Sequence, residues 1–127
     1  MKTFLSAALL IGGAFAASHV QAACNYPIAP GKFPDGSVAS RDEMKSAKDL
    51  VVKYDADMNS YLVCIRGEYE AKLAAQADAT PDQKQELERM HSQKEDAALA
   101  EVQDVVARFN EQLKAWKAKN GTEKKSS

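Results

Sequence analysis

The chain has 127 residues, and its 17 Lys and Arg nearly balance its 18 Asp and Glu, for a net charge of −1 at pH 7. That balance argues against nucleic acid as a partner, because nucleic-acid binding needs a strongly basic surface. The length suits one small domain. Six glycines beside abundant Ala, Glu, Gln and Lys favour helix over sheet, so we expect an all-α fold.

The first 22 residues have the pattern of a secretory signal peptide. Lys2 supplies the positive start, an apolar run covers residues 4–17, and a small-residue cleavage site ends at Ala22. We therefore expect cleavage near Ala22 and a periplasmic or secreted mature protein. The apolar run is shorter than the ~20 residues that span a bilayer, so we expect no transmembrane segment.

The two cysteines, Cys24 and Cys64, both lie in the exported part, where an oxidising compartment preserves disulfides. We therefore predict a Cys24–Cys64 disulfide. A redox or nucleophilic thiol would need a C-x-x-C or a nearby activating His, and the sequence has neither. Lipidation of Cys24 stays open as an alternative, although Gln21 stands where a lipobox has an aliphatic residue.

Residues 23–39 should form an extended arm, because their prolines and glycines exclude a helix. When extended, the arm is long enough to double back along the following helix and reach Cys64. Its sizeable apolar anchors are Tyr26, Ile28, Phe33 and Val38.

A first helix is predicted over about residues 40–77. Ser40 is a suitable N-cap, and Asp42 and Glu43 complement the dipole of the first turn. Apolar residues then recur at alternating intervals of three and four, the period of a helix that packs along another helix. They are Met44, Ala47, Val51, Tyr54, Met58, Tyr61 and Ile65.

A second helix is predicted over residues 81–119. Thr80 is a capping residue, Pro81 occupies the first helical position, and Gln83 completes a capping box. Asn120 and Gly121 should cap its end. Residues 121–127 would then form a flexible tail.

Two helices of similar length joined by a few residues predict a long antiparallel, coiled-coil-like hairpin over residues 40–120. Pairing positions equidistant from residue 80 brings apolar side chains together along most of it. The two polar partners lie near the loop, so that end should be looser. The pairs are Met44/Trp116, Ala47/Leu113, Val51/Phe109, Tyr54/Val106, Met58/Val102, Leu62/Ala98, Ile65/Glu95, Tyr69/His91 and Leu73/Leu87.

A short acidic run in the first helix resembles part of a calcium loop. Asp55, Asp57 and Asn59 match its first ligand positions. That loop needs a Gly and a Glu further on, where this chain has Ser60 and Arg66, so we expect no calcium site.

His91 is the only histidine beyond the predicted signal peptide. Glu88 and Glu95 flank it at helical spacing and could complete a metal site or form ion pairs on a solvated face. One His and two carboxylates are a weak donor set, so we predict no metal site.

The sequence offers no constellation for hydrolysis or group transfer. Glu68 and Glu70 fall on different helix faces, and there is no Gly-rich phosphate loop, no H-E-x-x-H and no G-x-S-x-G. We expect no catalytic residue, no cofactor and no enzymatic activity.

Basic residues gather around Trp116 at the C-terminal end and could attract anionic lipid or polymer. Lysine in a last turn also suits the helix dipole, and Trp116 fits the hairpin core, so the predicted anionic contact is weak. The basic residues are Lys114, Lys117, Lys119, Lys124 and Lys125.

Several motifs together resemble a family of short exported proteobacterial helical proteins with no characterised function. The likeness covers the mature chain and implies no activity. Its residues are Cys24-x-x-Pro27, Pro34-Asp35-Gly36, Tyr61-Leu62-x-Cys64 and Arg108-Phe109-Asn110 with Trp116.

A weaker similarity links residues 80–83 to the LTxxQ motif of the Spy and CpxP periplasmic chaperones, which are also built of long helices. Here Ala79 replaces the leucine, the motif occurs once, and those chaperones lack the cysteine pair. A capping box alone explains these residues.

Three functions are consistent with the sequence. The first is an exported non-enzymatic module that is structural or binds a protein, either another envelope protein or a second copy in a homodimer. The second is a Spy-like chaperone or stress protein. The third is an envelope-associated protein that contacts anionic surfaces through its basic C-terminal end.

Overall fold

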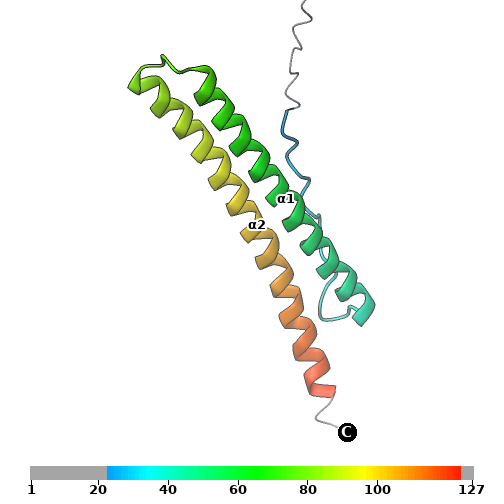
Figure 1. The fold of residues 1–127 in the computed structure, drawn as a ribbon. Helices are drawn as coiled ribbons and strands as arrows, with labels where there is room; N and C mark the ends of the chain where they lie inside the picture. The colour runs from blue at the N-terminus through cyan, green and yellow to red at the C-terminus, as the bar shows by residue number, and fades with distance from the viewer. Residues whose placement is uncertain (1–22, 124–127) are drawn as a thin grey trace, which may run out of the picture.

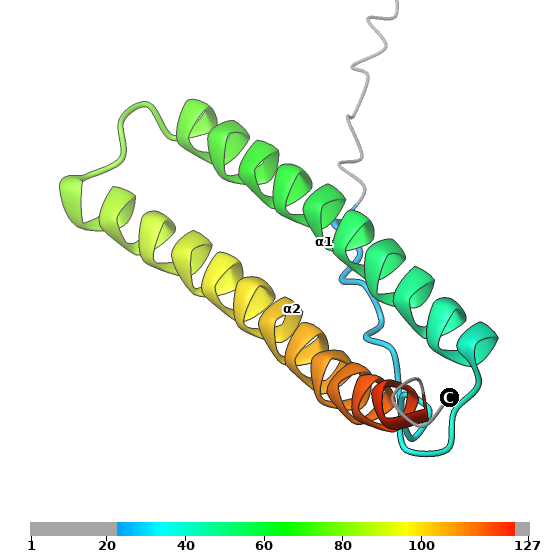
Figure 2. The same ribbon diagram turned by 90° about the horizontal axis from the view of Figure 1, so that it is seen from below.

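The computed structural model describes residues 23–123 as an extended arm followed by two helices, α1 (Arg41–Ala75) and α2 (Pro81–Glu123). The helices run antiparallel, joined by a short turn, and the arm lies beside them (Figure 1, Figure 2). This confirms the predicted all-α hairpin with an N-terminal arm bonded to its first helix. The predicted signal peptide and residues 124–127 lie outside the described residues.

Capping boxes start both helices. The Ser40 hydroxyl accepts from the Glu43 amide (3.2 Å), while the Ser40 amide donates to the Glu43 carboxylate (2.8 Å). The Thr80 hydroxyl and amide make the equivalent pair of bonds with Gln83 (3.3 and 2.9 Å). Each pair satisfies donors that a helix start leaves without an intrahelical partner.

The helix ends differ from the predicted ones. Helix α1 ends at Ala75, where the Gln76 amide bonds to carbonyls of the last turn. Helix α2 continues to Glu123, so the predicted cap at Asn120 and Gly121 is wrong. Gly121 lacks the positive φ of a glycine cap, and the Asn120 side chain donates to the Trp116 carbonyl within the helix (2.8 Å).

The apolar stripe predicted for the first helix is the face that α1 buries. Two core clusters lie along the seam between the helices, one around Met58 and Ile65 and one around Ala47 and Phe109. Every stripe residue is buried except the half-buried Val51. The buried residues of α1 are Met44, Ala47, Tyr54, Met58, Tyr61 and Ile65.

On α2 two residues opposite this stripe are fully buried, Ala98 as predicted and Val105 in place of the predicted Val106, which is half-buried. Ala98, Val102, Val105 and Phe109 follow one another at intervals of four, three and four. That alternation keeps them on the seam, whereas two successive intervals of four would drift off it.

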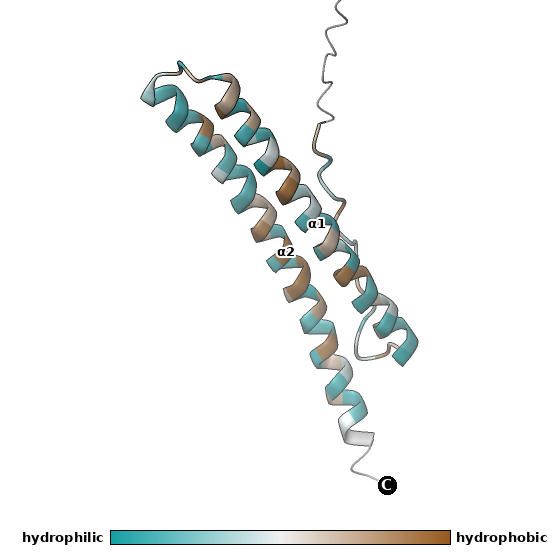
Figure 3. Ribbon diagram, viewed as in Figure 1, coloured by the Kyte–Doolittle hydropathy of each residue, from teal (hydrophilic) through white to brown (hydrophobic). Residues whose placement is uncertain are grey.

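The loop end buries little, as the register predicts. Among the described residues, the buried apolar core contains nothing beyond Ile65 on α1 and nothing before Ala98 on α2. Figure 3 shows that α2 is mostly hydrophilic near the loop and more hydrophobic further along.

The arm doubles back from Cys64 toward the start of α1, as Figure 2 shows. Tyr26 and Phe33 make ring contacts with the hairpin. Ile28 (95% exposed) and Val38 (73% exposed) do not act as the predicted anchors. Prolines fix the backbone of this short segment, so only some of its side chains can face the helices.

Candidate functional site

The arm is attached to the hairpin at several points, which together we call the arm junction. At its upstream end Cys24 is bonded to Cys64 of α1, with Cα atoms 5.8 Å apart, as the sequence predicts. The Cys24 amide donates to Glu68 Oε1 (3.3 Å), and Glu68 Oε2 pairs with Lys94 Nζ of α2 (3.8 Å). The arm, α1 and α2 therefore meet at one place.

Tyr26 is the next attachment. Its ring meets the Tyr61 ring edge-on, with centroids 4.9 Å apart, and its hydroxyl donates to Glu101 of α2. Burial, the hydrogen bond to Glu101 and the charge of that carboxylate raise the pKa of Tyr26 well above its usual range. Tyr26 therefore stays neutral and keeps the proton that it donates.

Arg108 of α2 holds the middle of the arm. Its Nη1 donates to the Gly31 carbonyl (3.0 Å), and its guanidinium lies 5.8 Å from the centroid of the Phe33 ring. Asp104 accepts from Arg108 Nε (2.8 Å) and orients the side chain. Phe33 in turn meets Phe109 edge-on at 5.7 Å. One cation thus satisfies an arm carbonyl and packs on an arm ring.

Gly36 lies close against the backbone of α2. Its amide donates to the Gln112 side chain (2.9 Å), and a Cβ at this position would lie 1.8 Å from the Gln112 carbonyl oxygen. Asp35 stabilises the turn by accepting from the amide and hydroxyl of Ser37, which lowers the pKa of Asp35. Only glycine fits at position 36.

The sequence did not reveal the α2 side of this junction. Glu101, Arg108 and Gln112 are seven and four residues apart, a spacing that places polar groups on one flank of the seam. That spacing was the available signal. The partner of the flank was not visible, because a proline-rich arm has no periodicity to match it.

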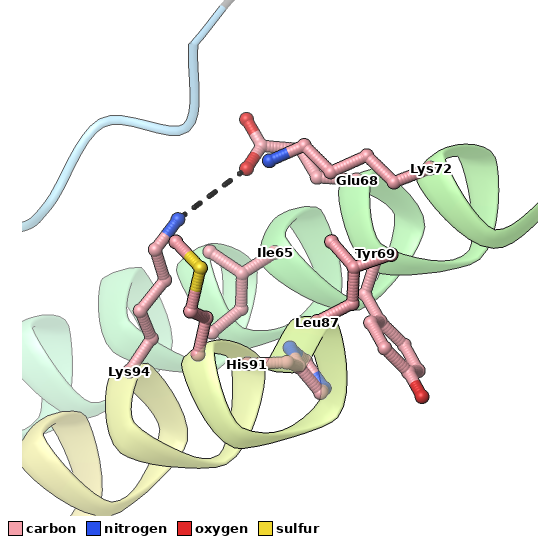
Figure 4. A pocket seen from close by; sticks show the side chains of 8 residues that line it. Ile65, Glu68, Tyr69, Lys72, Leu87, His91 and Lys94 are labelled. Carbon is pink, nitrogen blue, oxygen red and sulfur yellow. Dashed lines mark ion pairs between the residues drawn. The ribbon is translucent and has the colours of Figure 1, made fainter. Parts of the chain in front are cut away.

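His91 stacks on Tyr69 of α1, with ring centroids 4.6 Å apart, which joins a predicted mirror pair (Figure 4). Its Nε2 lies 3.3 Å from Glu95 Oε1, and the same oxygen lies 3.7 Å from Arg66 of α1. Glu88 is exposed. Within residues 23–123, no three His, Cys, Asp or Glu side chains gather as a metal site would need. The cluster joins the two helices where the core is thin.

A cavity of about 30 Å³ lies beside this stack and can hold little more than water. Figure 4 shows its lining residues projecting from both helices, with the Glu68–Lys94 ion pair at its edge. The lining residues are Ile65, Glu68, Tyr69, Lys72, Leu87, Met90, His91 and Lys94.

The residues that resemble a calcium loop are all helical. Asn59 donates to the Asp55 carbonyl one turn earlier (2.9 Å), whereas Asp57 pairs with Lys53. Positions 55 and 57 are about 200° apart around a helix, so their carboxylates diverge.

Comparisons with protein-family models, curated proteins and solved structures found no match to this chain. Neither described helix has a segment apolar and long enough to cross a membrane.

The structure describes part of the predicted basic C-terminal end. Trp116 packs against the core cluster around Phe109, as the register predicts, while Lys114, Lys117 and Lys119 are exposed. Lys124 and Lys125 lie outside the described residues.

Two ion pairs between the helices distinguish the two faces of the hairpin. Glu68–Lys94 lies on the arm side, because Glu68 also contacts Cys24. Arg66–Glu95 lies on the other side, since residues 66 and 68 are about 200° apart around the helix. We call this second side the open face.

Apolar side chains continue along the open face from that ion pair. Leu62 is one turn from Arg66, and Leu99 and Val102 are one and two turns from Glu95. Leu99 is 50% exposed, and Leu62, Val102 and Val106 are half-buried. The disulfide, hydrogen bonds and ring contacts that attach the described arm to the hairpin involve none of these four residues.

Proposed function

We propose that this protein is an exported, non-enzymatic helical module that binds an amphipathic helix of a partner protein through its open face. The supporting observation is an asymmetry: the arm attaches on one side of the seam, while no described segment covers the apolar stripe on the other. A groove between two helices is a common seat for a third helix.

The chemistry of the open face indicates the kind of partner. Leu62, Leu99, Val102 and Val106 form its apolar stripe, and the pair Arg66–Glu95 places both signs of charge at one end. On α1, the stretch from residue 48 to residue 66 is about 27 Å long, so a partner helix of about 18 residues would match it in length. A partner helix with an apolar stripe and mixed charges on its flanks fits this surface.

Site-specific photo-crosslinking tests the proposal. A crosslinkable residue at Leu99 should capture a discrete periplasmic protein, and the crosslinked segment should be helical with an apolar stripe. The same residue at Gln93, an exposed position about 120° from Leu99 around α2, is the matched control. In the protein that carries the crosslinkable residue at Leu99, Val106→Ser should weaken capture without loss of helix content.

Three outcomes contradict the proposal. Equal capture from Leu99 and Gln93 removes the open face as a binding surface. Capture of a second copy, with a dimeric mass in light scattering, replaces the partner by a homodimer. If the open face instead suppresses aggregation of unrelated unfolded clients, the Spy-like function gains support, although the bonds between Thr80 and Gln83 explain the shared motif as a helix start.

A further inference from the structure

One end of the open face is hollowed into a groove of about 400 Å³ between the start of α1 and the last turns of α2. Its volume lies within the range of small-molecule sites in proteins. Its apolar floor and its cationic rim come from different residues. The floor is Met44, Phe109, Leu113 and Trp116, and the rim is Arg41, Lys45 and Lys48. We call it the terminal groove.

The floor is anchored in the protein core. Met44 and Phe109 are 5% and 7% exposed and belong to a core cluster, so their positions are set by the hairpin itself. Leu113 and Trp116 pack against that cluster but remain half-buried, and both line the groove. Methionine and aromatic side chains suit aliphatic ligands, since they offer large polarizable surfaces.

The rim carries positive charge that is not engaged in any ion pair of the described chain. Arg41, Lys45 and Lys48 follow one another at intervals of four and three, which places them on one side of α1. Each is exposed, and none forms an ion pair with another residue among 23–123. Lys117 lies one turn after Leu113 and adds charge from α2.

None of the nearest acidic residues in sequence lines this groove, and Asp49, one turn after Lys45, forms no ion pair with it. Glu43 bonds to the Ser40 cap, and both Asp42 and Glu43 line a different groove, against Phe33 of the arm. The terminal groove therefore combines an apolar floor with cations along one edge. The complementary ligand has one aliphatic chain and an anionic head.

We propose that the terminal groove binds a free, single-chain anionic amphiphile. Its aliphatic chain lies on the floor, against Phe109, Leu113 and Trp116, and its carboxylate or phosphate head pairs with the cations of α1. A recessed floor favours a single chain over a bilayer surface, because a lipid still in the bilayer cannot place its chain between the two helices. This site is separate from the partner-binding stripe around Leu99.

Fluorescence offers a direct test, because Trp116 is the only tryptophan of the chain. The disulfide-bonded protein is titrated with dodecanoate below its micelle concentration while Trp116 emission is recorded. We expect a saturable blue shift. Dodecyl maltoside, which has the same chain and no charge, should give a much weaker response, and inorganic phosphate alone should give none.

A charge-matched pair of variants locates the site. The triple variant Arg41→Gln, Lys45→Gln, Lys48→Gln should weaken dodecanoate binding about tenfold or more, the loss expected for one hydrogen bond to a charged group. The control variant Lys53→Gln, Lys72→Gln, Lys84→Gln removes the same charge elsewhere and should bind as the parent does. All six positions are exposed, so both variants should melt within a few degrees of the parent.

Three results overturn the proposal. Equal weakening by both triple variants would show that net charge, not the rim, attracts the ligand. Equal binding of dodecyl maltoside would show that the groove does not recognise the charge of the head group. A Trp116 response to anionic vesicles without any response to monomeric dodecanoate would assign the groove to a membrane surface.

Discussion

Removal of the Cys24–Cys64 bond should strongly lower the stability of the protein without unfolding its helices at 25 °C. The bond joins residues 40 positions apart, and closing a loop of that size stabilises by about 4 kcal/mol in the chain-entropy model. For a domain of about 100 residues this corresponds to a loss of roughly 15–30 °C in melting temperature. Calorimetry or circular dichroism of Cys24→Ser/Cys64→Ser measures it.

The helices should survive at 25 °C because the seam does not depend on the bond. Met58, Ile65 and Val105 are each less than 2% exposed and lie between the two helices. The arm would keep only its noncovalent contacts, chiefly those of Tyr26, Gly31, Phe33 and Gly36. Far-ultraviolet helix signal should therefore remain, while trypsin should cut rapidly after Lys32, which is exposed in the middle of the arm.

Reduced wild-type protein is the control that separates loss of the bond from the serine substitutions. It should behave as the double variant does in both melting and proteolysis. Two free thiols in the mass spectrum of the exported protein would refute the reasoning. So would a bonded protein whose reduction changes neither its melting temperature nor its cleavage at Lys32.

Three further predictions concern the arm and the seam. Gly36→Ala should cost about 1–3 kcal/mol in the free energy of unfolding by overpacking against Gln112. The control Gly31→Ala should cost little, because nothing lies within 4 Å of a Cβ at that position. Equal losses would contradict the close approach of Gly36 to α2. Phe109→Ala should cost about 3–5 kcal/mol in urea unfolding, and the half-buried Leu87→Ala clearly less; equal costs would contradict the register. Because folding raises the pKa of Tyr26, its contribution is complete below pH 10 and is lost as pH rises further. Tyr26→Phe should therefore flatten the alkaline loss of stability above about pH 10, although burial also raises the pKa of Tyr54 and Tyr61, so part of that loss remains.

The hairpin could be predicted because its buried apolar residues recur at regular intervals in the sequence. Alternating intervals of three and four from Met44 to Ile65 specify which side of α1 is buried, and capping residues specify where each helix begins. The helix ends were harder to predict. Asn120 and Gly121 are compatible with a cap and with a continuing helix, and intrahelical bonds decided between them.

The choice between Val105 and Val106 shows the limit of pattern reasoning on α2. Both are valines, and a mirror rule centred on residue 80 selects Val106 opposite Tyr54. The structure buries Val105, since the seam follows the heptad spacing of its neighbours. His91 and Tyr69 show the converse. Their pairing looked unfavourable by polarity, yet two flat rings stack well across a thin part of the core.

The arm junction could be predicted only at its disulfide, because a bond between two cysteines needs no knowledge of orientation. The other attachments depend on which side of the proline-rich segment faces the hairpin. Tyr26 and Phe33 face it, while Ile28 is 95% exposed, and nothing in their residue types separates them. In the sequence, Arg108 and Gln112 resemble ordinary polar residues on the flank of a helix, because their partners lie in the arm.

The arrangement of these attachments explains what the arm adds to two helices that already share a seam. An apolar stripe that repeats at nearly regular intervals has alternative registers one repeat apart, and the loop near Ala75 fixes the register at one end only. The arm is bonded to α1 at Cys64 and bound to α2 at Gln112, on opposite sides of the Phe33–Phe109 contact. Sliding one helix past the other would pull these two points apart along a chain that prolines hold extended. The arm therefore fixes the register of the half of the hairpin that carries the terminal groove, where Met44 of α1 and Trp116 of α2 must stay opposite each other for the floor to exist.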